Sequence, residues 1–283
     1  MSIMKATQSL QGAGIGLRSQ HYQTIFETKP DIPWFEVLTD NYMGAGGLPL
    51  YHLEKVRNNY PISFHGVGLS LASTDPLNTQ YLSKLKQIIN RFEPTHVSDH
   101  LAWVSVNNHY THELLPFPYT REAINLIADK INIVQDFIGQ SLIVENPSTY
   151  LEFNHSEMPE WIFIQEIINE TGCKLLIDIN NVYVCAINHG FNPIEYISNI
   201  PQQHVSEIHL AGYEDRETHL YDTHGYQIHD EVWNLYEIAL SYFDSKPTLI
   251  EWDTDIPDFK VLQNEARKAQ IFLNQIQHQE QYA

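Results

Sequence analysis

Eight short apolar runs, each separated from the next by a longer segment, constrain the fold of this chain most strongly. The runs are rich in β-branched and aromatic residues, which favours buried strands. They cover residues 14–18, 34–38, 62–66, 96–100, 142–146, 175–179, 207–211 and 249–253. Helical segments such as 79–92, 121–138, 159–172 and 230–243 lie between them. Eight strand and helix units, repeating every ~35 residues, predict an α/β fold of the (β/α)8 TIM-barrel type rather than an open doubly wound sheet.

The sequence shows no division into separate units. No linker, charge block or low-complexity tract interrupts the 283 residues, so we expect one domain over residues 1–283. Its core is expected over about residues 14–270, with a frayed polar tail at 274–283.

No G-x-G-x-x-G or P-loop motif follows a strand, which removes the usual support for a nucleotide site. No apolar signal segment or membrane-spanning run is found, and this predicts a cytoplasmic protein without a membrane partner.

The composition narrows the classes of partner and ligand. A formal net charge of −19, from 35 acidic and 16 basic residues, argues against nucleic acid and anionic membranes. The two cysteines are too few for a disulfide scaffold or a thiolate metal cage. Fifteen histidines supply many neutral nitrogen donors, which favours transition-metal chemistry.

Polar residues stand where the apolar runs end. In a β/α barrel the carboxyl ends of the strands form the active face, so these residues should meet at one mouth. Burying many carboxylates and imidazoles together is costly unless they are paired or coordinated, so the joint pattern predicts metal ligands. Taken singly, each could instead be a core histidine, an ion-pair partner or part of a turn. The residues are His65, Asp99, His100, Glu145, Asn146, Asp178, His209 and Glu251, with Asp222 and His224 in the loop after the seventh run.

The predicted donor set contains imidazole and carboxylate but no thiolate. Such donors favour iron, manganese or zinc over copper(I) or an iron–sulfur cluster. Three groups suffice for one metal, so the number of candidates indicates two or three metal ions.

Seven motifs in a fixed order carry a family resemblance. They are SDHLAW (98–103), VENPSTY (144–150), DINNVYV (178–184), NHGF (188–191), EIHLAGY (207–213), YDTHG (221–225) and LIEWD (249–253). In these motifs, and from about Gly14 to Asp255, the chain resembles the multinuclear non-haem iron-dependent oxidative enzymes. That family includes the oxidase of methanobactin biosynthesis and many uncharacterised bacterial members. The resemblance implies a xylose-isomerase-like barrel that holds two or three iron ions, as Fe2+ or Fe3+.

The resemblance also implies a ligand set. The groups are His65, His100 and Glu145 for one iron; Asp178, His209 and Glu251, with Glu145 as a bridge, for a second; and Asn181, Asp222 and His224 for a third. His219, in the same loop as the last two, is interpreted as loop decoration.

Three further residues are expected around these ligands. Asn146 is placed to orient Glu145, and His189 in NHGF is expected to contact a ligand or the substrate. Tyr213 stands where many relatives have histidine, so a contact to a ligand or substrate differs there.

By resemblance, the expected function is an oxidase or oxygenase of natural-product biosynthesis. It would use dioxygen to modify a cysteine, or a neighbouring residue, of a ribosomally made precursor peptide. A partner protein that presents the peptide is a further expectation. The substrate would supply the soft thiolate ligand, since the chain supplies none.

Two other classes of function stay open. The first is a zinc- or manganese-dependent isomerase or hydrolase on the same barrel. It is less favoured because no Lys or Arg stands at the strand ends from the third run onward to bind an anionic substrate. The second is a metal-binding or storage protein without turnover, whose metals would be coordinatively closed.

Overall fold

Eight parallel strands close into a barrel in the computed structural model, which describes residues 9–107 and 109–280. The order around the barrel is β1-β12-β9-β8-β7-β4-β3-β2, so each strand lies beside its neighbours along the chain and β12 closes on β1. The predicted TIM barrel is confirmed. The strands are β1 Ala13–Gly16, β2 Phe35–Leu38, β3 Ile62–Gly66, β4 His96–His100, β7 Ile143–Glu145, β8 Lys174–Asp178, β9 Val205–Leu210 and β12 Thr248–Ile250.

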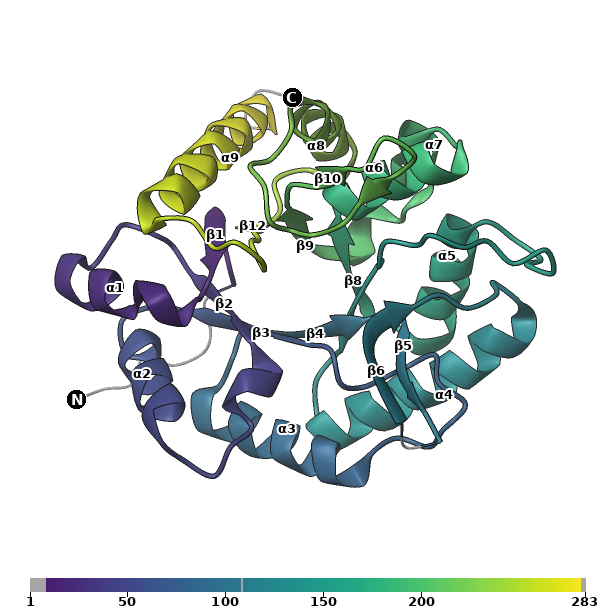
Figure 1. Ribbon diagram of the computed structural model, residues 1–283, viewed down its shortest axis with the longest axis horizontal. Coiled ribbons are helices and arrows are strands. Elements are labelled where there is room, and N and C mark those ends of the chain that lie inside the picture. Colours follow the sequence, from purple (N-terminus) through teal and green to yellow (C-terminus); the bar gives the residue numbers. More distant parts are fainter. Residues whose placement is uncertain (1–8, 108, 281–283) are drawn as a thin grey trace.

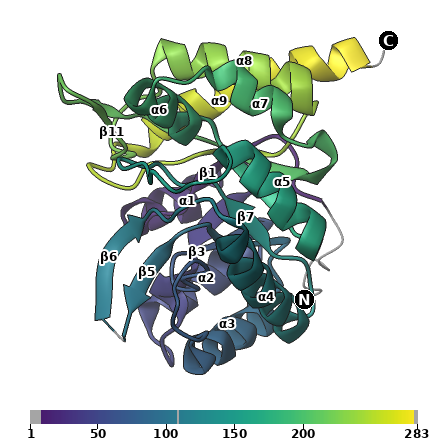
Figure 2. The ribbon, with the colours of Figure 1, turned by 90° about the vertical axis from the view of Figure 1, so that its right-hand side faces the viewer.

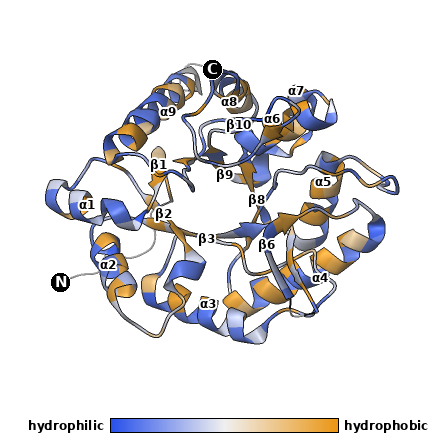
Figure 3. Cartoon of the chain, viewed as in Figure 1, coloured by the Kyte–Doolittle hydropathy of each residue, from blue (hydrophilic) through white to orange (hydrophobic). Residues whose placement is uncertain are grey.

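Helices surround the barrel as an outer layer (Figure 1). Many carry a hydrophobic and a hydrophilic side, as the colours of Figure 3 show. In α4 the residues at three- and four-residue steps, Ile124, Ile127, Ile131 and Val134, are fully buried against the sheet, as their spacing predicts. The helices are α1 Tyr22–Thr28, α2 Leu48–Arg57, α3 Thr79–Phe92, α4 Arg121–Ile138, α5 Glu160–Thr171, α6 Ile179–His189, α7 Pro193–Asn199, α8 Asp230–Phe243 and α9 Phe259–Glu280.

The ends of these helices follow from local sequence. Thr120 caps α4 by accepting a hydrogen bond from the backbone N–H of Ala123, and Asn78 caps α3 in the same way. Gly139 ends α4 at φ 76°, a left-handed conformation that glycine adopts without a steric penalty. Asp178 caps α6 by accepting from the N–H of Asn181, which fixes one carboxylate oxygen at the barrel mouth.

Two small hairpins rise from the mouth of the barrel. Strands β5 (Trp103–Val106) and β6 (His109–Leu115) follow β4, and strands β10 (Glu214–Asp215) and β11 (Leu220–Tyr221) follow β9. Figure 2 shows both hairpin regions on the same side of the molecule, where the barrel strands end. Short 3-10 helices complete the connections at Ser19–His21, Thr39–Tyr42 and Gln202–His204.

The interior of the barrel changes from apolar to polar along its axis. At the amino-terminal end, Trp34, Leu249 and Leu10 form a buried plug. A Cβ at Gly14 would lie 2.5 Å from the Trp34 ring, so only glycine leaves room for the plug. Above it the inward side chains are Glu36, Ser63, Ser98 and the residues of the candidate site, where such barrels usually hold Val, Ile and Leu. This polar interior therefore needs a chemical explanation.

The C-terminal helix and the last barrel strand end at other residues than the sequence predicts. The polar tail expected to fray is helical to Glu280, because Ile276 packs on the core and Gln277 donates a hydrogen bond to Ser245 Oγ at 2.9 Å. Residues 281–283 lie outside the described residues. The last predicted run, 249–253, forms a strand only to Ile250. Among the described helices, none has the length and apolar character needed to cross a membrane.

Candidate metal centre

The register of the barrel strands brings the predicted ligands together. His100 on β4 pairs with Glu145 on β7, and Asp178 on β8 pairs with His209 on β9. Residues paired across parallel strands point to the same face, so all four side chains enter the barrel. Glu251 follows β12 directly, and a ligand atom of it lies within 4.8 Å of those of Glu145, Asp178 and His209. The carboxyl ends of five neighbouring strands thus converge on one buried cluster.

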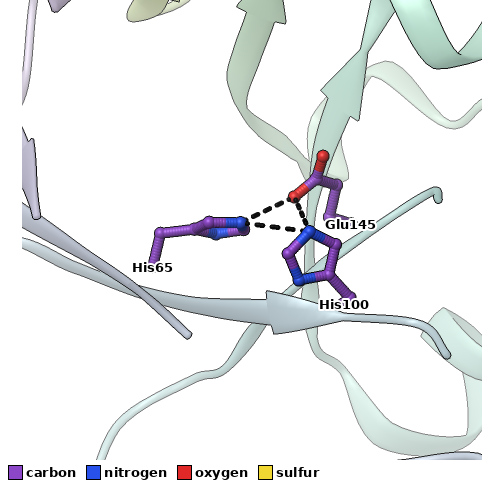
Figure 4. A group of neighbouring side chains, drawn as sticks. All are labelled: His65, His100 and Glu145. Atoms are coloured by element: carbon purple, nitrogen blue, oxygen red, sulfur yellow. Dashed lines mark hydrogen bonds and ion pairs between the residues drawn. The ribbon is translucent and has the colours of Figure 1, made fainter. Parts of the chain in front are cut away.

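The first group consists of His65, His100 and Glu145 (Figure 4). Glu145 Oε2 lies 3.0 Å from His65 Nε2 and 3.3 Å from His100 Nε2, and the two Nε2 atoms are 3.3 Å apart. His65 and Glu145 are fully buried. Three potential ligand atoms therefore surround one point in the barrel.

Hydrogen bonds set the orientation of both imidazoles. His100 Nδ1 lies 3.1 Å from the carbonyl oxygen of Gly66, which can only accept, so Nδ1 donates. Ser98 donates its hydroxyl proton to the Phe64 carbonyl, and its oxygen accepts from His65 Nδ1 at 2.7 Å. In the neutral rings each Nε2 atom therefore carries a lone pair, and both lone pairs point at Glu145. Such an arrangement is repulsive unless a metal ion or a proton lies between the three atoms.

The spacing of these atoms fits a metal ion. Ligands ~2.1 Å from a metal lie about 3.0 Å apart when adjacent in an octahedron and about 3.4 Å apart in a tetrahedron. The separations of 3.0 and 3.3 Å fall in that range. Within the described part of the chain, Glu145 Oε2 also makes no hydrogen bond. The first group is thus suited to hold a metal by its chemistry and by its distances.

Substituting Ser98 with alanine tests the role of its hydroxyl group. Ser98→Ala removes the acceptor that holds His65 Nδ1–H, so His65 can adopt the other tautomer. We expect metal affinity to fall by about 10–100-fold, as for other groups that orient a ligand. Chelator competition measures this affinity. The control is Ser83→Ala on α3, whose hydroxyl only bonds the Thr79 carbonyl. Equal affinities for the two variants would contradict this role.

The second group is Glu145, Asp178, His209 and Glu251, with one ligand atom of each within 4.8 Å of the others. His209 Nδ1 lies 2.8 Å from Glu251 Oε2. While Asp178 Oδ1 caps α6, its Oδ2 makes no hydrogen bond among the described residues. Glu145 belongs to both the first and the second group, so its carboxylate can reach two adjacent ions.

The third predicted group, Asn181, Asp222 and His224, is only partly brought together in the structure. His224 Nε2 lies 2.8 Å from Asp222 Oδ1 and 3.6 Å from Asp178 Oδ2. Asn181 Oδ1 is buried and makes no hydrogen bond within the described chain, which leaves it free as a ligand. His224 adopts a left-handed conformation, φ 46°, and its carbonyl accepts from the N–H of Asp253 at 2.7 Å. Strained backbone of this kind is typical of residues held for function.

The shifted pKa values in the cluster show that its buried carboxylates need a balancing positive charge. Burial raises the pKa of Asp178 well above its ordinary value, since the charged form loses water. Burial alone would lower the pKa of His65, but the carboxylates of Glu36 and Glu145 raise it to about 10. Burial also raises the pKa of Glu36, despite the nearby His209. In the metal-free chain, protons therefore balance the carboxylates, and bound metal would take their place.

Two buried carboxylates beneath the cluster were not predicted. His209 Nε2 lies 3.1 Å from Glu36 Oε2 and 3.6 Å from Glu207 Oε1. Glu207 also contacts His96 Nδ1 at 2.6 Å. Carboxylates in these positions hold an imidazole so that its other nitrogen faces a metal. The available signal was the two-residue period of strands, since Glu207 precedes His209 by two positions and so shares its face.

The structure shows the following contacts for the three residues expected around the ligands. Asn146 pairs with the backbone of Asp178, through 2.9 and 3.2 Å bonds, rather than with Glu145. His189 Nε2 donates to the Thr149 carbonyl at 2.9 Å, outside the three groups. Tyr213 stacks on His229 with ring centroids 3.9 Å apart. The side chain of His219 is exposed, its Nδ1 lies 2.9 Å from Thr218 Oγ1, and it belongs to none of the three groups.

Comparison with known proteins identifies the family of the chain. Residues 12–274 match the family described as RiPP precursor modification enzyme MbnB/TglH/ChrH, where RiPP denotes a ribosomally made and modified peptide. The chain belongs to this family. The predicted resemblance, which ran through seven motifs of the same enzymes, is confirmed.

Relatives of this member of the MbnB/TglH/ChrH family align with it over nearly its full length. A UPF0276 protein of Acaryochloris marina (strain MBIC 11017) is 56% identical over 272 residues, covering 96% of this chain and 98% of the relative. A UPF0276 protein of Anaeromyxobacter sp. (strain Fw109-5) is 44% identical over 266 residues, covering 94% of both.

Solved structures similar to this family member show the fold. An L-ribulose 3-epimerase matches with a TM-score of 0.62 at 10% identity, covering 97% of this chain and 98% of that one. A xylose isomerase-like TIM barrel protein from Mycobacterium smegmatis, in complex with magnesium, matches with a TM-score of 0.60 at 13% identity, covering 96% and 99%. At such low identity the likeness concerns the barrel alone, which is xylose-isomerase-like as predicted.

Proposed function

We propose that this protein is a multinuclear iron-dependent oxidase or oxygenase. Its substrate is a cysteine, or a residue next to one, in a ribosomally made precursor peptide, and dioxygen is the oxidant. Membership of a family of precursor modification enzymes supports the peptide substrate. The donor set of imidazole and carboxylate, without protein thiolate, supports iron.

The observation that carries the proposal is the convergence of His65 Nε2 and His100 Nε2 on Glu145 Oε2. Glu145 also belongs to the second group, so one carboxylate can hold two ions side by side. Iron ions held by these residues would supply two redox centres, which suits binding of the substrate and exchange of an electron. The residues proposed as ligands are His65, His100, Glu145, Asp178, Asn181, His209, Asp222, His224 and Glu251.

A cavity of about 580 Å³ lies at the barrel mouth, beside the ends of β1 and β2, and we propose that the substrate approaches the cluster through it. Asp253 lines the cavity, and its Oδ2 lies 3.5 Å from His224 Nδ1. Arg18 donates a hydrogen bond to Asp253 and another, at 2.9 Å, to the Trp252 carbonyl, which fixes this wall. The volume is typical of pockets that enclose a small ligand or a few side chains.

The thiolate in this chemistry must come from the substrate. Cys173 and Cys185 are buried, and neither belongs to the ligand groups. Burial raises the pKa of Cys185 to about 12, so its thiol stays protonated. A peptide cysteine that enters the mouth cavity is therefore the proposed sulfur ligand. We include a peptide-presenting partner protein in the proposal, because the acidic chain suits a basic partner.

The alternative is a zinc- or manganese-dependent isomerase or hydrolase. The epimerase neighbours share the barrel, but they share too little sequence to carry their activity over. Arg18, the basic residue that lines the mouth cavity, is already paired with Asp253. An anionic substrate would therefore find no unpaired guanidinium or ammonium group in that lining.

Turnover with a defined metal tests the proposal. The chain is loaded with iron or with zinc and mixed with cysteine-containing candidate precursor peptides in the presence of dioxygen. We expect oxygen consumption and a mass change of the peptide with iron only, and neither with a peptide in which serine replaces cysteine. Sugar isomerisation or ester hydrolysis by the zinc- or manganese-loaded chain, without oxygen uptake, would support the alternative instead.

A further inference from the structure

A second pocket, of about 210 Å³, opens beside the loop that joins β7 to α5. Thr149 lines this pocket, while its neighbour Ser148 donates a hydrogen bond to Asp222 Oδ2 at 2.9 Å. The pocket is thus next to the candidate metal centre along the chain but shares none of its residues. Its aromatic lining consists of Phe117, Tyr119, Phe153, Trp161, Phe191 and Tyr196.

Three of these rings lie close together and are not coplanar. The Trp161 ring lies 5.9 Å from that of Phe191 and 5.8 Å from that of Tyr196, and the last two rings are 6.1 Å apart. The faces of aromatic rings are electronegative and attract an ammonium or guanidinium group within about 6 Å. The lining contains no lysine or arginine that could occupy this position.

A carboxyl group without a cationic partner completes the pocket. Glu160 is the first residue of α5, and its Oε1 accepts a hydrogen bond from the Tyr196 hydroxyl at 3.2 Å. Further along α5, Glu166 and Glu170 pair with Arg121, whereas the ion pairs of the described chain include none for Glu160. The hydroxyl groups of Tyr196 and Tyr119 and the helix N-terminus stabilise the carboxylate only in part. Burial raises its pKa to about 7.

We propose that this pocket binds the cationic side chain of an arginine or lysine in a polypeptide. The volume is below the ~300 Å³ at which pockets begin to enclose a whole small molecule, so it suits one side chain. Leu151 at the rim is 67% exposed and offers apolar surface to the residues that flank the cation. The inference goes beyond the proposed function, since it requires neither iron nor turnover.

Calorimetric titration of the wild-type chain tests the inference. The probes are Nα-acetyl-arginine methylamide and its neutral isostere, Nα-acetyl-citrulline methylamide. We expect the arginine probe to bind at least about tenfold more tightly, because only it carries the charge. Equal affinities would overturn the proposal. Binding of spermidine tighter than that of the peptide Ala-Arg-Ala would overturn the assignment to a polypeptide.

A matched pair of variants locates the site. Glu160→Gln keeps the hydrogen-bonding shape but removes the charge, and we expect the arginine probe to bind at least about tenfold more weakly. Glu170→Gln removes the same charge from α5 outside the pocket and should leave binding unchanged. Unchanged binding by Glu160→Gln, or an equal loss in Glu170→Gln, would overturn the proposal. If Glu160→Gln fails to fold, the arginine and citrulline comparison in the wild-type chain decides.

The pH dependence gives an independent readout. Glu160 has a raised pKa of about 7, so it ionises between pH 6 and pH 8, and affinity for the arginine probe should rise over that range. The titratable groups that face it are Tyr119, Tyr196, Cys185, His189 and Glu152. In Glu160→Gln the rise should disappear, and a rise that persists in this variant would contradict the role of Glu160.

Discussion

Glu145→Gln is expected to remove the metal from the first and second groups together. Glu145 Oε2 lies 3.0 and 3.3 Å from two imidazoles and also belongs to the group around Asp178 and His209. A neutral amide binds a metal more weakly than a carboxylate does, and it carries no charge to balance two cations. Since groups that merely orient a ligand are worth ~10–100-fold, we expect activity and metal affinity to fall by more than about 100-fold.

Elemental analysis of the purified variant measures this effect. The control is Glu122→Gln, which removes the same charge from an exposed position at the start of α4. The control should retain the metal content and activity of the parent. A Glu145→Gln variant that keeps the parental metal content would show that Glu145 is not a ligand, and it would remove the bridge from the account.

Glu251→Gln is expected to destabilise the metal-free chain strongly. Glu251 Oε2 lies 2.8 Å from His209 Nδ1 and 3.3 Å from His224 Nδ1, and all three side chains are buried. The carboxylates around His209 and His224 raise the pKa of both imidazoles well above the ordinary value. Glu251→Gln removes the carboxylate charge that the two imidazoles share and leaves part of their buried positive charge uncompensated, which costs about 3–5 kcal/mol in the free energy of unfolding.

Thermal unfolding in the presence of a chelator checks this prediction. A loss of that size lowers Tm by roughly 6–20 °C in a domain of this length. The comparison variant is Glu54→Gln, which breaks an exposed ion pair with Arg91 and should cost less than about 1 kcal/mol. A similar, small change in Tm for both variants would contradict the role of Glu251 as a buried counter-charge.

The barrel could be predicted from sequence because its signal is local and repeated. Each strand is a short β-branched run, and each helix of the type of α4 carries its own apolar face. The hairpin of β5 and β6 was missed, because it lies on the mouth and its pairing shifts register between Trp103 and Ser105. Such irregular antiparallel pairs leave no clear period in the sequence.

The sequence indicated which side chains meet at the barrel mouth better than it indicated their individual contacts. Residues such as His100 and Asp178 stand out because they are polar and end apolar runs. Glu36 lies inside the WFEVL run with no polar neighbour, so nothing in the sequence indicates that it reaches His209 across the barrel. The partner of Asn146 depends on the packing of β7 against β8, which no local pattern specifies. Contacts across the barrel follow from strand register, and register is a property of the assembled sheet.

The most direct test of the account is the metal content of chain purified without oxygen from iron-supplied cells, combined with Mössbauer spectra before and after exposure to air. The account predicts more than one iron per chain, with a mixed-valence population that changes on contact with air. Zinc or manganese that persists despite the iron supply, with no response to dioxygen, would contradict the oxidative function. A chain that cannot be loaded with metal would contradict the ligand cluster itself.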